Sequence, residues 1–480
     1  MKPATAIKAA KPSVALDHSQ LFDVSVTGPL TKKRCINLDN GASTQPTTAV
    51  MTAVGNFMKY YSSAHRGNGF KSQITTWAFE EARVGLLRFV QAREDQHLCI
   101  FTKNTTESVN LLAARFPFVK ERNVILISSM EHHSSDLPWR KTGHTIVYIA
   151  INKDGTLDMD DLQNKVSMYG NSLALVCVSG ASNVTGILNP IYKVARIAHS
   201  VGAQVYIDCA QLVSRRAIDV KDLDDPEHLD YIAFAGHKMY APFGSAVLIG
   251  RKDAFSGGTP FLDGGGAVNI VTLVNVTYKE GAEKEEAGSP NTVGAYAMFI
   301  ASKQLQQITF SAIENHERAL MEYALPKLQK IPGLKLAGGY PVDLGTRGGV
   351  ISFTIDNIHF NLVAAILGTD LISLRENFIR KDINNKIGYI RLSFGLGNTF
   401  TDVDLVVDAL KKIVHGEYKF KYIQDEHGEF SAAGVNCDFS AFVSLDVEPL
   451  KHPTRMTLKT VFLEWKEKGK KWMKIHPKLR

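Results

Sequence analysis

The sequence predicts an α/β protein in which a largely parallel sheet is followed by a smaller α+β domain. From residue 36 to about residue 315, short apolar runs alternate with amphipathic helical segments. Continuous apolar strands separated by helices are typical of parallel sheets whose two faces are both covered. The chain has 480 residues, of which 45% are hydrophobic and 21% are charged, so it is long enough for two or three globular domains.

Seven runs in this block are predicted strands because they are apolar and β-prone. These runs are residues 97–102, 123–128, 145–150, 173–180, 204–209, 231–235 and 246–250. Residues 106–116 and 191–202 have the amphipathic pattern of helices that cover such a sheet. Ligands of these sheets bind beyond the carboxyl ends of the strands, so the polar residues that follow these runs are candidate site residues.

Shorter elements after a long helical stretch, residues 294–331, predict the smaller domain. Its predicted elements are strands 348–355 and 389–396 and helices 361–370 and 402–416, whereas residues 417–450 look irregular. The predicted organisation is an N-terminal arm (1–35), a large domain (36–315), a small α+β domain (316–418) and a C-terminal extension (419–480).

Composition argues against several protein classes. The chain has no apolar run long enough to cross a bilayer, and its N-terminus lacks the apolar core of a secretory signal, which leaves an organellar transit peptide as the targeting alternative. Scattered cysteines without CxxC spacing argue against a zinc site or a disulfide framework. We therefore expect a cytoplasmic protein with no metal at its site. The cysteines are Cys35, Cys99, Cys177, Cys209 and Cys437.

The basic charge of the chain lies in its C-terminal tail. Residues 451–480 contain ten Lys/Arg and two Asp/Glu, whereas the net charge of the whole chain is +7. Lysines in this tail are interleaved with Trp465 and Trp472. Two alternatives follow: a solvated helix that packs through its aromatic residues, or a surface that binds nucleic acid or an acidic protein.

A lysine follows a histidine just after the predicted strand 231–235, in the sequence FAGHKMYAPFG. Lysine is normally left in water, so one interpretation of Lys238 is an exposed turn residue. The polar residues after other strands favour a different interpretation. Asp208 closes a buried strand, where a carboxylate needs a positively charged or hydrogen-bonding partner, and Gln211 follows it within one turn.

Further polar groups follow the other strands. KNTTESVN places Thr105 and Thr106 at a helix start, where backbone N–H groups and hydroxyls bind phosphate. His132 in EHHSSDLPW and Asn183 in SGASNVTG also follow predicted strands. Each motif alone is compatible with a capping box, a hydrogen-bonded loop or a turn. Together they match what pyridoxal 5′-phosphate requires: a lysine for the Schiff base, an acidic partner for the ring nitrogen and donors for the phosphate.

The chain resembles the class V (fold type I) aminotransferase family, and within it group II cysteine desulfurases, selenocysteine lyases and isopenicillin-N-epimerase-like enzymes. The resemblance covers about residues 36–415 and rests on motifs that match in order. These are LDNGAST (38–44), AHRGNG (64–69), NTTESVNLLA (104–113), EHHSSDLPW (131–139), SNVTG (182–186), DCAQ (208–211), GHKMYAPFG (236–244) and EAGSPNTVGAYAM (286–298). The resemblance implies the fold type I of PLP-dependent transferases, with a mainly parallel seven-stranded sheet and pyridoxal 5′-phosphate as cofactor.

The resemblance also assigns roles to individual residues. Lys238 would bind the cofactor and move the substrate's α-proton, Asp208 would pair with the pyridinium nitrogen, and His132 would stack on the ring; these three are the predicted catalytic residues. Asn183 and Gln211 would contact the ring substituents and the phenolic oxygen. The predicted cofactor-binding residues are Thr105, Thr106, His132, Asn183, Asp208, Gln211, His237, Lys238 and Ser289.

Two further roles concern the phosphate and the substrate. Thr105 or Thr106, with His237, would hold the phosphate, and Ser289 would reach the phosphate of a neighbouring subunit, which implies a homodimer with shared sites. Arg391 would bind the substrate carboxylate, a task that suits a planar bidentate donor, unless it forms a surface ion pair instead. The predicted substrate-binding residues are Arg391, His65, Asn183 and Arg375.

The sequence departs from the family pattern in two places. Ala235 stands where the family has a serine that contacts the phosphate, so we expect weaker cofactor retention. Group II desulfurases also carry a mobile R-x-G-H-H-C loop whose cysteine thiolate attacks the substrate sulfur. Arg375 matches the arginine of that loop, but no cysteine follows it before Cys437. Persulfide formation by the usual route therefore has no acceptor.

The resemblance and its departures predict a PLP-dependent enzyme that cleaves the C–S or C–Se bond of a cysteine-like amino acid without covalent capture of the sulfur. Epimerisation or transamination of a specialised amino acid is the alternative. Arg380 and Lys381 could meet an anionic group of the substrate, or could form a solvated basic loop. An alternative of another class is a scaffold that retains the cofactor and uses residues 451–480 to bind an acidic partner or nucleic acid.

Overall fold

The computed structural model describes residues 35–339, 343–370, 372–373, 375–380, 386–435 and 443, without the side chains of residues 373–387. Four features named above lie outside this description: most of the predicted N-terminal arm, Lys381, Cys437, and residues 451–480 with Trp465 and Trp472. The chain divides into two compact units, Met1–Ala433 and Gly434–Arg480, and the elements below belong to the first. The predicted boundaries at residues 315 and 418 stay predictions.

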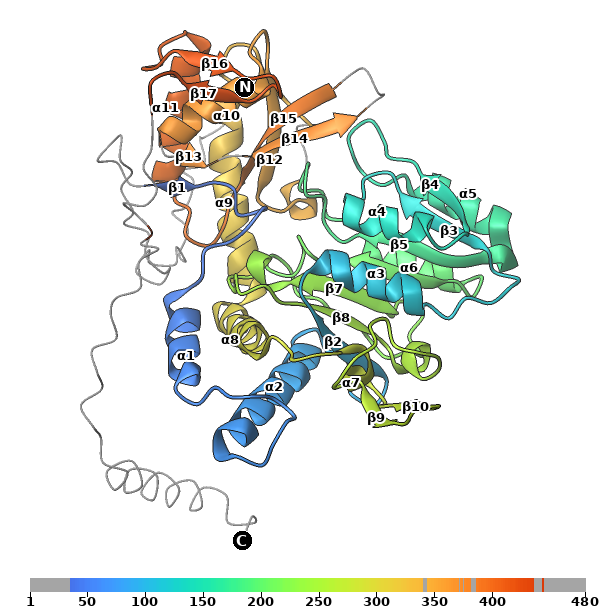
Figure 1. Cartoon of the computed structure of the whole chain (residues 1–480). Helices are drawn as coiled ribbons and strands as arrows, with labels where there is room; N and C mark the ends of the chain where they lie inside the picture. The colour runs from blue at the N-terminus through green and yellow to red at the C-terminus, as the bar shows by residue number, and fades with distance from the viewer. Residues whose placement is uncertain are drawn as a thin grey trace, which may run out of the picture. The chain divides into compact units, whose positions relative to one another are not determined.

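Seven strands form one sheet in the order β2-β8-β7-β6-β5-β3-β4 (Figure 1). They are β2 (His97–Thr102), β3 (Val124–Ser128), β4 (Thr145–Ile149), β5 (Leu173–Ser179), β6 (Gln204–Asp208), β7 (Tyr231–Ala235) and β8 (Ala246–Arg251). Only the two pairings of β8, with β2 and with β7, are antiparallel within this sheet. Each strand matches a predicted run to within one residue at either end, so the predicted α/β architecture is confirmed.

Alternate side chains of the strands pack into different cores, as strand geometry requires. In β3, Val124 and Leu126 join the core on one face, and Ile125 and Ile127 join the core on the other. The first core includes residues of α5 (Met159–Tyr169), α6 (Ile191–His199) and α8 (Thr292–Ile308), and the second includes residues of α3 (Thr105–Arg115) and α4 (His133–Arg140). Both faces are covered, so polar groups of the strands are accessible mainly at the strand ends.

The predicted helical stretch 294–331 consists of two helices, α8 and α9 (Phe310–Leu328). Thr309 separates them with a φ of 73°, and its side chain caps α9 by accepting a hydrogen bond from the Ala312 N–H. The break between them is not expected from sequence, because a β-branched residue in this left-handed conformation is rare. The remaining helical segments of the large domain are α1 (Thr48–Met58), α2 (Phe70–Phe89), α7 (Ala282–Glu285) and the 3-10 turns Gly170–Ser172, Gly236–Lys238 and Lys252–Phe255.

A four-stranded antiparallel sheet in the order β11-β12-β15-β14 forms the smaller α+β part. Its elements are β11 (Leu334–Leu336), the 3-10 turn Leu344–Thr346, β12 (Val350–Ile355), α10 (Phe360–Thr369), β14 (Arg375–Arg380), β15 (Lys386–Ser393) and α11 (Phe400–Val414). A separate hydrophobic core joins this sheet to α9, α10 and α11. The first strand, β1 (Ile36–Asn37), pairs in parallel with β13 (Ile372–Ser373), so the chain enters the fold beside this sheet.

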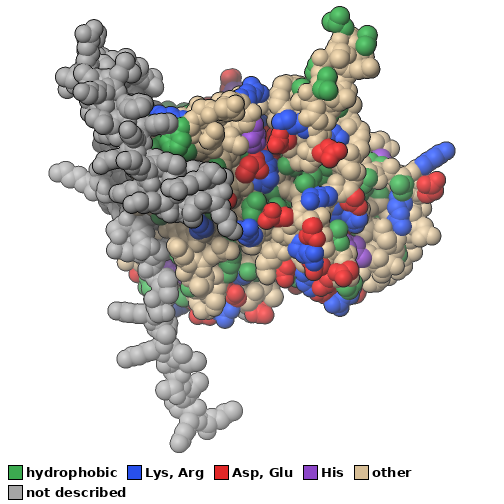
Figure 2. All heavy atoms as spheres, turned by 90° about the horizontal axis from the view of Figure 1, so that it is seen from below, with side chains coloured by type: hydrophobic (Ala, Val, Ile, Leu, Met, Phe, Trp, Pro, Cys, Tyr) green, Lys and Arg blue, Asp and Glu red, His purple; other side chains and the backbone are tan. Residues whose placement is uncertain are grey.

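Besides β14 and its pairing with β15, two hairpins were not predicted. One pairs β16 (Tyr422–Gln424) with β17 (Phe430–Ala432) in a segment that the sequence analysis expects to be irregular. The other pairs β9 (Val268–Val271) with β10 (Val276–Tyr278), and at its tip the side chains of Leu273 and Val274 are 105% and 85% exposed. Hydrophobic side chains gather at the tip of a projection in Figure 2. Among the described residues, helices both long and apolar enough to cross a membrane do not occur.

Candidate active site

Lys238 ends the 3-10 turn that follows β7. The turn begins with Gly236, where a Cβ atom would stand 2.6 Å from the backbone oxygen of Ala241, so no larger residue fits. Lys238 is half-buried and lines a cavity together with Thr44 and Gln211. The interpretation of Lys238 as an exposed turn residue is therefore wrong, and two predicted site residues, Lys238 and Gln211, share one cavity.

The loop 38–44 closes one side of this cavity. The side chain of Gln211 donates a hydrogen bond to the backbone oxygen of Gly41 at 2.6 Å. Thr44 donates both its backbone N–H (2.8 Å) and its hydroxyl (3.1 Å) to the backbone oxygen of His237. These bonds fix the LDNGAST loop against the turn that carries Lys238.

Asp208 ends β6 as a buried carboxylate that is 6% exposed. Its Oδ2 accepts a hydrogen bond from the hydroxyl of Ser135 at 2.6 Å, and its Oδ1 accepts one from the backbone N–H of Ala210 at 2.9 Å. Ser135 lies in the first turn of α4, so this contact fixes α4 to the end of β6. The Ser135 hydroxyl is thus one of the hydrogen-bonding partners that a buried carboxylate at this position needs.

His132, at the start of α4, is linked to the predicted phosphate site by one hydroxyl. Its Nδ1 lies 2.9 Å from the hydroxyl oxygen of Ser134, which in turn lies 2.7 Å from the hydroxyl oxygen of Thr106 in α3. The imidazole of His132 is exposed. Two residues predicted to bind the cofactor, His132 and Thr106, thus share a partner at the carboxyl edge of the sheet.

The start of α3 contains an unused hydroxyl. The helix is capped by Asn104, whose side chain accepts the Glu107 N–H at 2.9 Å. The Oγ1 atom of Thr105 is buried, and no group among the described residues bonds to it. A buried polar atom without a partner is costly, so this hydroxyl is well suited to a ligand. Backbone N–H groups at the same helix start favour an anion.

His237 borders the same region but brings no positive charge at neutral pH. Burial and the neighbouring charge of Lys238 lower the pKa of His237 to about 4, so its imidazole is neutral. Ala235, at the end of β7, is fully buried and offers no hydroxyl. The donors that these residues offer to an anion are therefore hydroxyls and backbone N–H groups.

Glu131 joins the carboxyl ends of β3 and β5. Its Oε1 accepts hydrogen bonds from the Ser128 hydroxyl and the Ser179 N–H, both at 2.6 Å, and its Oε2 lies 2.7 Å from the Ser179 hydroxyl. Burial, with a further contribution from the charge of Asp208, raises the pKa of Glu131 to about 8. The residue directly before His132 is therefore mostly protonated at pH 7.

Arg391 lies in β15 and is 2% exposed. Its Nη2 bonds to Oδ1 of Asp39 at 2.8 Å, and its Nη1 donates to the backbone oxygen of Asn183 at 2.9 Å. The structure thus brings Arg391 and Asn183 together, through the backbone of Asn183. Arg391 is not a surface ion pair, because its guanidinium is buried where the small sheet meets the loops after β1 and β5.

The remaining predicted site residues are Arg375, beside Arg391, and His65 and Ser289 on other segments. In the sheet register Arg375 is opposite Arg391, and the β14–β15 hairpin pairs regularly from there to Arg380 opposite Lys386. His65 bonds to Glu80 of α2 at 3.0 Å. Ser289 is exposed in the loop before α8. The predicted roles of these residues, like those of the residues above, stay predictions.

Three of the four described cysteines are poor nucleophiles. Cys99, Cys177 and Cys209 are buried, and burial raises the pKa of all three thiols, that of Cys99 to about 12. A thiolate is the reactive form, so these residues are unreactive at neutral pH. Cys35 is the only partly exposed cysteine in the described part of the chain.

Sequence reasoning missed several residues of this network, among them Glu131, Ser135 and Asp39. All three lie inside motifs that were recognised, EHHSSDLPW and LDNGAST. Only the folded chain shows that their side chains bond to Ser179, Asp208 and Arg391. A polar residue directly beside a predicted site residue was the available signal.

Comparison with known proteins shows the family to which the chain belongs. Residues 36–406 match the family described as aminotransferase class V. A probable cysteine desulfurase from Halalkalibacterium halodurans is 34% identical over 388 residues, covering 78% of this chain and 92% of the relative. A cysteine desulfurase from Haloferax volcanii is 32% identical, with coverages of 78% and 88%. The solved structure of a cysteine desulfurase from Thermococcus onnurineus is 29% identical with a TM-score of 0.72, covering 82% of this chain and 98% of that one.

Proposed function

We propose that this chain, which belongs to the class V aminotransferase family, cleaves the C–S or C–Se bond of a cysteine-like amino acid. The chain is a PLP-dependent enzyme, as members of this family are. The observation that carries the proposal is the cluster at the carboxyl edge of the large sheet, where Lys238, Gln211 and Asp208 end or follow strands β6 and β7. The chain aligns with 92% of a probable cysteine desulfurase and with 88% of a cysteine desulfurase, the two relatives named above.

The residues of this edge fit pyridoxal 5′-phosphate. The buried Thr105 hydroxyl without a described partner and the start of α3 suit its phosphate. The Asp208 carboxylate accepts two hydrogen bonds and retains lone pairs for a protonated ring nitrogen. Lys238 supplies the amine that such a cofactor requires. When bound, the cofactor withdraws electrons from the substrate's α-carbon and eases removal of its proton.

Three side chains would act on the substrate. Arg391, buried and held by Asp39, would bind the α-carboxylate by charge-assisted hydrogen bonds. Lys238 would accept the α-proton at its Nζ atom, since it is the amine in the cavity. Thr44 and the loop that it fixes would limit the entry of water from one side.

Sulfur would leave directly and not through a protein thiolate. The buried cysteines have raised thiol pKa values, and the β14–β15 pairing begins at Arg375, the residue that the sequence analysis matched to the arginine of the family's cysteine loop. For L-cysteine the balanced reaction is cysteine plus water giving pyruvate, ammonia and hydrogen sulfide. The C–S bond breaks with its electron pair on sulfur, and no external oxidant or reductant is consumed.

Product analysis after mixing the cofactor-loaded enzyme with L-cysteine tests this proposal. We expect sulfide, pyruvate and ammonia in equal amounts, with and without a reductant, and no product from Lys238→Ala. Sulfide with alanine would overturn direct elimination and indicate a thiol acceptor such as Cys437. No product at all from the wild-type enzyme would exclude cysteine and favour epimerisation or transamination of another amino acid.

We also propose a homodimer with shared sites. His65 and Ser289 lie on two loops that Arg66 ties together, since its Nη2 donates to the backbone oxygen of Gly288 at 3.1 Å. Beside them the β9–β10 hairpin exposes an apolar tip, a feature typical of protein interfaces. This arrangement supports donation of both residues to the site of a second copy.

The oligomeric state tests the homodimer. In sedimentation velocity we expect a dimer that Leu273→Asp converts to an inactive monomer. Leu405→Asp, at a 44% exposed position of α11, is the matched control and should stay dimeric. A wild-type monomer with full activity would contradict shared sites. A cytoplasmic location is likewise proposed, and the unpaired state of the described cysteines supports it.

A further inference from the structure

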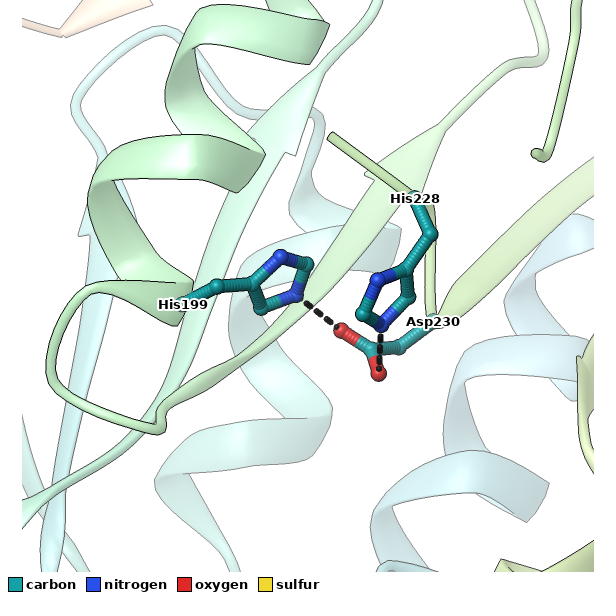
Figure 3. Close-up of side chains that lie close together, drawn as sticks. All are labelled: His199, His228 and Asp230. Atoms are coloured by element: carbon teal, nitrogen blue, oxygen red, sulfur yellow. Dashed lines mark hydrogen bonds and ion pairs between the residues drawn. The ribbon is translucent and has the colours of Figure 1, made fainter. Parts of the chain in front are cut away.

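A second polar cluster lies at the amino edge of the large sheet, the end opposite to Lys238. It consists of His199 at the end of α6, and His228 and Asp230 in the segment that enters β7 (Figure 3). The sequence analysis did not find it, because His199 lies about thirty residues before the other two and no cysteine is involved. The side chain of Asp230 is fully buried, and those of His199 and His228 are 14% and 9% exposed.

Both imidazoles direct the same nitrogen at the same carboxylate. Nε2 of His199 lies 2.8 Å from Oδ2 of Asp230, and Nε2 of His228 lies 3.1 Å from Oδ1. The two rings are stacked, with centroids 4.0 Å apart and planes inclined by 13°. Figure 3 shows the two nitrogens and the carboxylate converging on one small region.

The opposite nitrogens of the two rings also face acceptors. Nδ1 of His199 lies 2.8 Å from the backbone oxygen of Pro226, and Nδ1 of His228 lies 2.6 Å from that of Asp225. A carbonyl oxygen can only accept, so each Nδ1 carries a hydrogen. Each Nε2 then presents a lone pair to a carboxylate oxygen unless a cation lies between them. The cluster must hold either two extra protons or a metal ion.

An Nδ1–H donated to a carbonyl is the arrangement that fixes a metal-binding histidine with its Nε2 free for the metal. The carboxylate is also held from outside: its Oδ2 accepts the Val205 N–H at 2.8 Å, and its Oδ1 lies 3.1 Å from Nη1 of Arg251. The charge of Arg251 is offset by a two-bond pair with Asp253, at 3.0 Å and 2.5 Å. Such outer hydrogen bonds typically support metal-binding carboxylates.

We propose that His199, His228 and Asp230 bind one zinc-class divalent cation. Two imidazoles and a carboxylate form a donor set suited to Zn²⁺, with a fourth position left for water. The Nε2–Oδ distances of 2.8 Å and 3.1 Å are close to the roughly 3.3 Å between neighbouring ligands around tetrahedral zinc. All three ligand atoms already lie within 4.8 Å of one another. Because two stacked rings cannot both direct in-plane lone pairs at one ion, metal binding requires one imidazole to rotate out of the stack.

The ion would join the end of α6 to the segment before β7. It lies at the opposite end of β6 and β7 from Asp208 and Lys238, so it has no contact with the cofactor. Because it binds the folded chain, it raises the unfolding temperature without changing the chemistry at Lys238. The inference is therefore independent of the proposed reaction.

Metal titration of the tag-free, cofactor-loaded protein tests the site after dialysis against a chelator. We expect one equivalent of Co²⁺ to bind with the absorption bands of four-coordinate cobalt, and Zn²⁺ to displace it. Unfolding temperature should rise with added Zn²⁺. His199→Gln and His228→Gln each remove one of the three metal ligands. Loss of an outer-shell partner typically weakens metal binding 10- to 100-fold, so we expect each of these variants to weaken it by roughly 100-fold or more.

His415→Gln is the matched control, because His415 is exposed and also directs Nδ1 at a backbone oxygen, that of Lys411 at 2.8 Å. It should bind Co²⁺ as the wild type does. The visible absorbance of bound cofactor reports whether each variant is folded. The proposal would be overturned if the wild type failed to bind one equivalent of Co²⁺ or Zn²⁺. It would also be overturned if both glutamine variants bound the metal as tightly as the wild type does.

Discussion

Asp208 and Asp230 are both buried carboxylates beside β6 and β7, at opposite ends of these strands. Asp208 has a hydroxyl and a backbone N–H as its hydrogen-bond donors. Asp230 has four nitrogen groups as partners: two imidazoles, a guanidinium and a backbone N–H. Burial alone would raise the pKa of Asp230, but hydrogen bonds from His199 and His228 hold it well below its ordinary value.

The difference shows why burial by itself does not identify a functional carboxylate. The chain surrounds Asp230 with two imidazoles, a guanidinium and a backbone N–H of its own, so that carboxylate ties elements together. The described partners of Asp208 are neutral, so a cationic group that arrives with a ligand can still improve its environment. Changes at the two positions should accordingly affect different measurements.

The largest expected effect is on catalysis, from Asp208→Asn. Asparagine keeps the shape and can still accept from Ser135, but it lacks the negative charge that would pair with the ring nitrogen of the cofactor. We expect kcat to fall by about 10³-fold, the upper range for losing one preorganised electrostatic group. Steady-state kinetics of a variant with normal visible absorbance would measure this. Retention of kcat would exclude Asp208 as the partner of the cofactor.

Asp230→Asn should have the opposite effect, a loss of stability without a loss of kcat. It leaves two imidazoles and Arg251 around a neutral amide, so we expect the folded state to lose about 3 kcal/mol. Chemical unfolding of the holoenzyme would show the shift in midpoint, while kcat of the folded variant stays at the wild-type value. Asp253→Asn is the control: this exposed partner of Arg251 should change stability by less than about 1 kcal/mol. A fall in kcat without loss of stability would contradict the comparison.

Glu131→Gln should change how the free energy of unfolding depends on pH. The pKa of Glu131 is raised from 4.5 to about 8 in the folded state, so between these values the unfolded chain holds fewer protons there than the folded chain. The free energy of unfolding contributed by Glu131 therefore falls as pH rises from 4.5 to 8 and levels off above 8.

Glutamine does not titrate, so the Glu131→Gln variant should lose this contribution. Unfolding midpoints measured from pH 5 to pH 9 would show the stability of the variant rising relative to that of the wild type as pH rises. A parallel pair of curves would mean that Glu131 ionises normally in the folded protein. Ser128→Ala is a useful companion, because it removes one hydrogen bond to Glu131 and leaves its carboxyl group in place.

The large sheet was predictable because most of its strands are apolar runs, and such a run can be recognised from the sequence without knowing which strands lie beside it. The break at Thr309 and the β14–β15 hairpin were not, since both depend on packing that overrides local preference. The same distinction holds at the site. Lys238 and Asp208 were found as unusual residues at strand ends, but the bond from Ser135 to Asp208 joins residues on α4 and β6 that only the folded sheet brings together.

The smallest expected effect concerns Asp39, the partner of Arg391. If Arg391 binds the substrate carboxylate, the 2.8 Å bond to Asp39 holds a long side chain in one rotamer before the substrate arrives. Ordering a free arginine costs up to roughly 1.5–2 kcal/mol, so Asp39→Asn should raise KM by about 10-fold and leave kcat nearly unchanged. Arg391→Lys should raise KM further, because lysine cannot form the bidentate pair. A lower KM in Asp39→Asn would instead mean that Asp39 competes with the substrate for the guanidinium, and that the loop 38–44 must release Arg391 before binding.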